Sequence, residues 1–62
     1  MQPDQALIRA WTLTDDWTDA SEDEMETLLP TLRDAGYVEV QENAWNFTPE
    51  GVARAEALGI SN

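Results

Sequence analysis

The sequence predicts a small α+β domain in the order helix, connection, helix, β-hairpin, helix. In the middle of the chain, apolar residues recur at the spacing of one buried helical face, and these are Met25, Leu28, Leu29 and Leu32. Two short runs rich in aromatic and β-branched residues, 37–41 and 45–47, predict paired strands. Thr48 followed by Pro49 predicts the start of a last helix. The chain has 62 residues, so we expect residues 1–62 to form one domain.

The first predicted helix spans residues 3–13, with Pro3 at its first position and an apolar side of Leu7, Ile8 and Trp11. Residues 12–20 are rich in threonine and aspartate, which favour turns and caps, and predict a connection with at most one helical turn. Trp17 is the one large apolar residue there. Two interpretations stay open for Trp17: packing over the edge of the core, or an exposed anchor for a partner.

The central helix is predicted to start at Ser21, which forms a capping-box pattern with Glu24, and to end at Gly36 in a left-handed conformation. Pro30 lies inside this helix and removes one backbone hydrogen bond. Burial of the leucines should outweigh that loss, so we expect a kinked but continuous helix; the alternative is a break near Leu29.

The two predicted strands should form a hairpin with Asn43 at its bend, in which alternate residues lie on an apolar face and on a solvent-facing polar face. The last helix should be capped by Thr48, closed by Gly59, and inward-facing at Val52, Ala55 and Leu58. Gly51 is unfavourable in a first helical turn, and close approach of the hairpin backbone would explain it.

Charge is the strongest global feature of the chain. It has 13 acidic residues against Arg9, Arg33 and Arg54, no lysine, and a formal net charge of -10. One interpretation is an anionic surface directed at a basic partner, or one that imitates a nucleic-acid backbone. The other is adaptation to high salt, in which acidity maintains solubility and has no bearing on partners.

The composition argues against an enzyme or a metalloprotein. The chain has no cysteine and no histidine, and it lacks a glycine-rich phosphate loop, so thiol, triad and nucleotide chemistry have no candidate residues. The acids of residues 15–26 lack the spacing of a calcium-binding EF-hand. We therefore expect no catalytic residues, no cofactor and no metal. Without a signal-peptide pattern or a long apolar run, we expect a cytoplasmic protein.

Residues 21–58 resemble the second half of winged helix-turn-helix domains of the MarR and ArsR regulator type. The residues that carry the resemblance are Leu29, Leu32, Gly36, Tyr37 and Val38, followed by Thr48, Pro49 and Gly51. The resemblance implies a winged-helix-like fold in which residues 21–35 form the recognition helix and residues 42–44 the tip of the wing. It also implies DNA binding, but the outward side of this helix is acidic, and DNA recognition normally needs several cationic contacts to phosphate.

We therefore expect an interaction module that binds a basic or nucleic-acid-binding protein through the acidic side of the central helix. A small regulator or inhibitor, including a virus-encoded one that imitates DNA charge, fits this description. The candidate partner-binding residues are Glu22, Asp23, Glu26 and Asp34, with Asp15, Asp16 and Asp19 extending the field and Trp17 as an apolar anchor. The alternative is a DNA-binding regulator from a salt-loving organism. Whether the chain is a monomer or a homodimer stays open.

Overall fold

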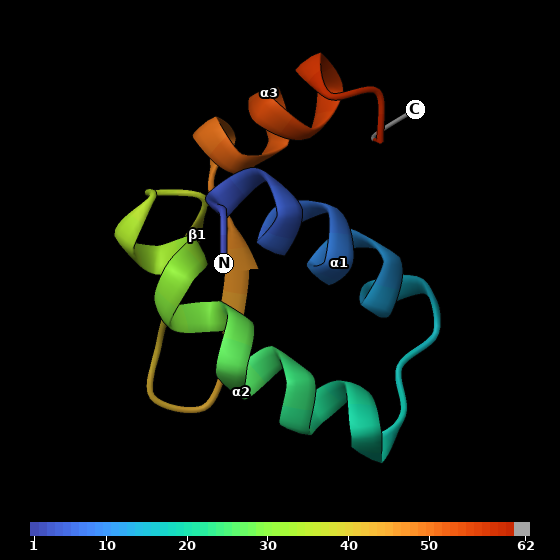
Figure 1. Cartoon of the computed structure of the whole chain (residues 1–62). Helices are drawn as coiled ribbons and strands as arrows, with labels where there is room; N and C mark the ends of the chain where they lie inside the picture. The colour runs from blue at the N-terminus through green and yellow to red at the C-terminus, as the bar shows by residue number, and fades with distance from the viewer. Residues whose placement is uncertain (61–62) are drawn as a thin grey trace.

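The computed structural model describes residues 1–60 and shows three helices and one two-stranded antiparallel hairpin in that range. The order is α1 (Pro3–Asp15), α2 (Asp19–Asp34), β1 (Val38–Val40), β2 (Trp45–Phe47) and α3 (Pro49–Ala57). Figure 1 shows α1 lying between α2 and α3, with the hairpin beside the C-terminal end of α2. This winged-helix-like arrangement confirms the predicted α+β class and element order. Within residues 1–60, the helices are too short or too polar to cross a membrane.

Helix α1 continues to Asp15, beyond the predicted end at residue 13. Thr12 and Thr14, which predicted a turn, instead lie within the helix. The Thr12 hydroxyl donates a hydrogen bond to the Ile8 carbonyl, and the Thr14 hydroxyl donates one to the Trp11 carbonyl. The inward prediction for Ile8 was wrong, since Ile8 is exposed. The side that packs on α2 and α3 is instead narrow and contains two alanines, which let the helices approach closely; its buried residues are Ala6, Leu7, Ala10 and Leu13.

The predicted capping box at the start of α2 was wrong. The cap is Thr18, whose extended backbone precedes the helix and whose hydroxyl accepts a hydrogen bond from the Ser21 amide at 3.2 Å. Ser21 lies inside the first turn, where it is buried and donates its hydroxyl proton to the Asp16 carbonyl. Glu24 binds Arg9 and therefore makes no capping contact. The connection between α1 and α2 is correspondingly short.

Helix α2 passes through Pro30 without a break, so the predicted continuity of the helix is confirmed and the alternative, a break near Leu29, is excluded. Pro30 lies on the exposed side, whereas Met25, Leu28 and Leu32 are buried and anchor the helix on both sides of the proline.

Gly36 ends α2 with a φ of 81°, as predicted. The Gly36 amide donates to the Arg33 carbonyl at 3.0 Å, and the Tyr37 amide donates to the Leu32 carbonyl at 2.9 Å. These two hydrogen bonds form a Schellman motif, which reverses the chain directly into β1.

The hairpin pairs Val38 with Phe47, Glu39 with Asn46 and Val40 with Trp45. The end of the hairpin that carries the turn extends beyond the core. Val38 is 3% exposed, whereas Val40, on the same face, is 46% exposed. The apolar face of the hairpin therefore continues past the core at the end that carries the turn.

Helix α3 is docked by Thr48 and Gly51. The Thr48 hydroxyl caps the helix by accepting from the Gly51 amide at 3.1 Å and donates to the Gly36 carbonyl at 2.6 Å. A Cβ on Gly51 would lie 3.0 Å from the carbonyl carbon of Tyr37 and closer still to its oxygen, which confirms the predicted close backbone approach. The inward prediction for Val52 was wrong: this contact turns Gly51 and Ala55 toward the core and leaves Val52 exposed.

Candidate partner-binding groove

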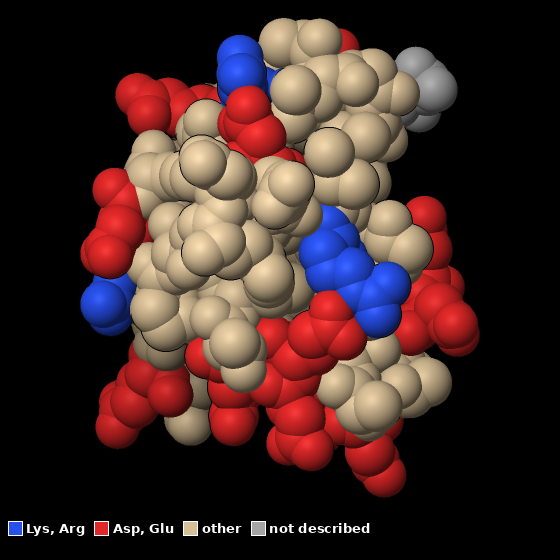
Figure 2. All heavy atoms as spheres, in the orientation of Figure 1, with Lys and Arg blue, Asp and Glu red and all other residues tan. Residues whose placement is uncertain are grey.

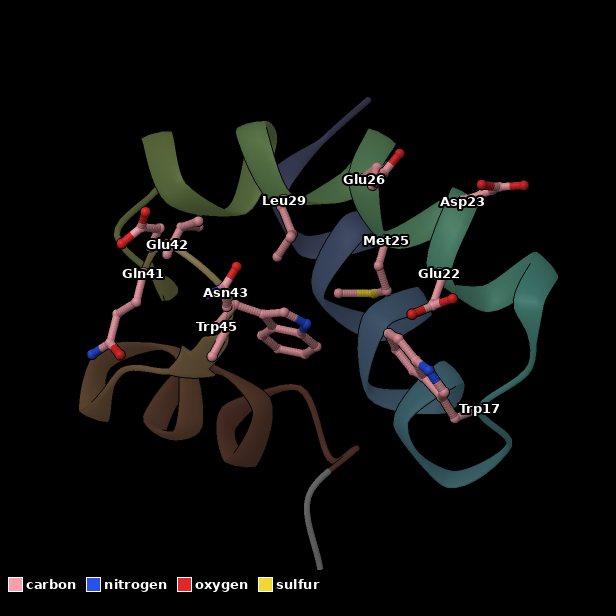
Figure 3. A pocket seen from close by; sticks show the side chains of 12 residues that line it. Trp17, Glu22, Asp23, Met25, Glu26, Leu29, Gln41, Glu42, Asn43 and Trp45 are labelled. Carbon is pink, nitrogen blue, oxygen red and sulfur yellow. The ribbon is translucent and has the colours of Figure 1, made fainter.

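An open groove of about 400 Å³ lies between the N-terminal half of α2 and the turn of the hairpin. Its walls come from the connection that carries Trp17, from one side of α2, and from the turn at residues 41–44 with its flanking strand ends. Figure 3 shows these side chains around the groove; the connection and α2 are adjacent in the sequence, and the hairpin turn follows later in the chain. We call this feature the α2–hairpin groove. Its lining residues are Trp17, Glu22, Asp23, Met25, Glu26, Leu29, Val40, Gln41, Glu42, Asn43, Ala44 and Trp45.

The floor of the α2–hairpin groove is apolar. Met25 is only 1% exposed and Leu29 is half-buried against the core, so both are fixed by packing. Val40 and Trp17 are each 46% exposed. Trp17 is not among the residues packed against the hydrophobic core, so packing over the core edge is not observed, and its role as an anchor for a partner stays a prediction.

Trp45 forms one side of the groove and is held in place by an aromatic cluster. Its ring stands edge-on to Phe47 with 5.0 Å between ring centroids, and Phe47 in turn lies 4.5 Å from the ring of Trp11. Edge-to-face packing of this kind adds stability beyond burial alone. The groove thus has one firmly packed tryptophan, Trp45, and one that projects from a connection, Trp17.

Four carboxylates border this apolar floor: Glu22, Asp23 and Glu26 from α2, and Glu42 from the hairpin turn. Figure 3 shows the Glu22 carboxylate directed toward the groove, whereas those of Asp23 and Glu26 are directed away from it. Figure 2 shows acidic side chains gathered along the lower edge of the molecule, over α2. The groove therefore combines a hydrophobic floor with an anionic border.

The remaining predicted site residues are not brought to the groove. Asp34 is the last residue of α2, at the end opposite to the groove-lining acids, and Asp15 and Asp16 lie where α1 ends. Asp19 begins α2 but does not line the groove. These four acids contribute to the overall negative field and form no common site with Trp17.

Sequence reasoning missed Val40, Trp45 and Glu42 as groove residues. The alternation of the hairpin assigned Val40 and Trp45 to its apolar face, and the pairing of these two residues next to the bend was the available signal. A pair at the bend lies farthest from the helix contacts at the other end of the hairpin, so its apolar surface extends beyond the core.

Two of the three arginines form ion pairs with carboxylates of the same chain. Arg9 forms a two-pronged ion pair with Glu24 that connects α1 to α2, and Arg54 binds Asp4 at 3.0 and 2.6 Å, connecting α3 to α1. The hydrogen bonds from the arginines lower the pKa of the Asp4 and Glu24 carboxyls and raise the pKa of both guanidinium groups. Arg33, in the last turn of α2, takes no part in an ion pair within residues 1–60.

Among residues 1–60, no three acidic side chains are placed to hold one metal ion. The groove carboxylates instead stand around a hydrophobic floor, an arrangement suited to a ligand with both positive charge and apolar surface.

Comparisons of the chain with protein-family models, with curated proteins and with solved structures found no match. The fold and groove define a small acidic α+β domain of winged-helix-like arrangement.

Proposed function

We propose that this protein is a non-enzymatic interaction module that binds a basic or nucleic-acid-binding protein in the α2–hairpin groove. The observation that carries the proposal is one groove that is lined by the exposed Trp17 and by the acidic residues Glu22, Asp23 and Glu26. Exposed tryptophans contribute strongly to binding energy when a partner buries them, and surrounding acids attract a basic surface.

The two parts of the groove have different roles in this proposal. The acids act at long range, so they orient a basic partner and increase its association rate, an effect that weakens as salt shortens the screening length. The apolar floor acts on contact, so it slows dissociation. A partner needs both a positive charge and an apolar side chain to use the whole groove.

The internal ion pairs favour a protein partner over DNA. Contacts to DNA phosphates come mainly from arginine and lysine, but Arg9 and Arg54 are each bound to a carboxylate of the same chain. The acidic side of α2 would repel a phosphate backbone, because Glu22, Asp23 and Glu26 are all exposed there. The same acidity would let α2 compete with DNA for a nucleic-acid-binding protein.

A charge-reversal pair tests the proposal. The triple variant Glu22→Lys, Asp23→Lys, Glu26→Lys changes the groove, and the control variant Glu39→Lys, Glu50→Lys, Glu56→Lys makes the same change in net charge at exposed positions outside it. The probe is a labelled peptide of alternating arginine, lysine and leucine, followed by fluorescence anisotropy at about 0.15 M salt, where the screening length is about 8 Å.

We expect the groove variant to lose binding and the control to retain most of it, with both keeping the circular dichroism spectrum of the wild type. Equal losses in the two variants would show that net charge alone binds the peptide and would refute the groove. Duplex DNA is titrated in parallel up to about 1 M salt, where screening falls to about 3 Å. Tight DNA binding there would favour the DNA-binding alternative.

A further inference from the structure

Trp17, Trp45 and Glu22 are arranged around the middle of the α2–hairpin groove in a way that suits one particular chemical group of a ligand. Figure 3 shows the indole rings of Trp17 and Trp45 extending toward the middle of the groove, with the Glu22 carboxylate turned to the same side. We propose that this is a binding site for an arginine side chain of the partner, with the guanidinium against the indole rings and paired to Glu22. The inference rests on the proposed function and adds the chemical identity of the anchoring residue.

The chemistry of guanidinium matches these three residues better than that of an ammonium group. Guanidinium is planar, stacks on aromatic faces, is weakly hydrated and pairs with a carboxylate through two parallel hydrogen bonds. Tryptophan is the aromatic residue that attracts cations most strongly. A lysine ammonium would gain the charge attraction of Glu22, but it would lose more hydration and could not stack.

The rest of the groove floor suits the stem of an arginine. Leu29 lies on the α2 side and Val40 on the hairpin side, and these two residues offer apolar surface to the three methylene groups of the side chain. Val40 is 46% exposed, so a ligand would cover apolar surface that now faces solvent. The charged head and the apolar stem thus each meet a complementary part of the groove.

The arginine must come from a different protein. Among the residues that the structure describes, no arginine lines the groove, and Arg9 and Arg54 are already held by Glu24 and Asp4. A second copy of this chain would offer Arg33 alone and would add another net charge of -10. Such a pair of molecules would repel each other, whereas a basic partner would be attracted.

Two peptides of identical length and charge test the inference, one with arginine and one with lysine at every cationic position and the same leucines between them. Their affinities for the wild-type protein are measured by anisotropy at about 0.15 M salt. We expect the arginine peptide to bind about tenfold more tightly, the size of effect that a partly desolvated cation–π contact supports.

Three variants assign that preference to the site. Trp17→Ala and Glu22→Gln should reduce the arginine preference toward unity, while Asp23→Asn should keep it, because the Asp23 carboxylate is directed away from the groove although it lines it. Asp23→Asn removes the same charge as Glu22→Gln and is its matched control. Trp17 lies outside the hydrophobic core, so its truncation should leave the fold intact.

The outcomes separate the two proposals. If both peptides bind the wild type equally, the arginine site is refuted and the acidic interaction module stands. If neither binds, both proposals fail.

Indole N–H signals in NMR spectra give a second measurement. The signals of Trp17 and Trp45 should shift with the arginine peptide, and that of Trp11, which does not line the groove, should not. Unshifted Trp17 and Trp45 signals would overturn the site even if arginine were preferred.

Discussion

The docking of α3 against the start of the hairpin gives a sharp prediction for Gly51→Ala. By helix propensity alone, alanine in place of glycine would stabilise α3 by up to about 1 kcal/mol. The new Cβ, however, would overlap the Tyr37 carbonyl, which also accepts a hydrogen bond from the Thr48 amide at 3.0 Å. That carbonyl has little freedom to move away without weakening this bond, which contributes about 1 kcal/mol.

We therefore expect Gly51→Ala to reduce the free energy of unfolding by about 1 to 3 kcal/mol, as overpacking does elsewhere. In a domain of this size each kcal/mol lowers the melting temperature by about 4 to 8 °C. The assay is thermal and urea unfolding followed by circular dichroism. Ala53→Gly, at an exposed position of the same helix, is the control that measures propensity without a contact. A Gly51→Ala protein as stable as the wild type, or more stable, would refute the close approach.

Three further predictions concern the core, the α2 cap and acid. Leu32→Ala should cost about 2 to 5 kcal/mol in urea unfolding because Leu32 is fully buried, whereas Val40→Ala, at an exposed position, should change little. Thr18→Ala should cost about 1 kcal/mol of stability by removing the α2 cap, and an unchanged midpoint would contradict the observed cap. The folded-state pKa of Asp4 lies below its ordinary value of 3.8, so its pairing stabilises the protein above that pH and is lost as pH falls through the lower folded-state pKa. The stability difference between wild type and Asp4→Asn should accordingly shrink in acid, and a constant difference across the titration would contradict the pairing with Arg54.

The local signals in the sequence were sufficient for the fold class. Helical spacing found the buried side of α2, and Gly36, Thr48 and Gly51 marked a helix end, a cap and a close contact that the structure confirms. The errors arose where tertiary contacts decide between local alternatives. Ser21 has a good cap sequence, but Thr18 caps the helix, the Ser21 hydroxyl donates to the Asp16 carbonyl, and Glu24 pairs with Arg9 on another helix.

The candidate site was only partly predictable. Acids at the start of α2 and the exposed Trp17 were found because they are neighbours in the sequence. The opposite wall was missed, since the placement of Trp45 depends on ring packing against Phe47 and on a hairpin that extends past the core. Helical periodicity placed Asp34 on the outward side of α2 but did not separate the two ends of that helix, so Asp34 was grouped with acids that lie far along it.

Backbone amide mapping by NMR, with the arginine peptide as probe, tests the central claim most directly. We expect the largest shifts to cluster at the groove, at Trp17, Glu22, Leu29 and Trp45, and to saturate with the same affinity as the anisotropy titration. Shifts confined to Asp15, Asp16 and Asp34, or spread evenly over all the surface acids, would show that the charge attracts the peptide without the groove and would contradict the account.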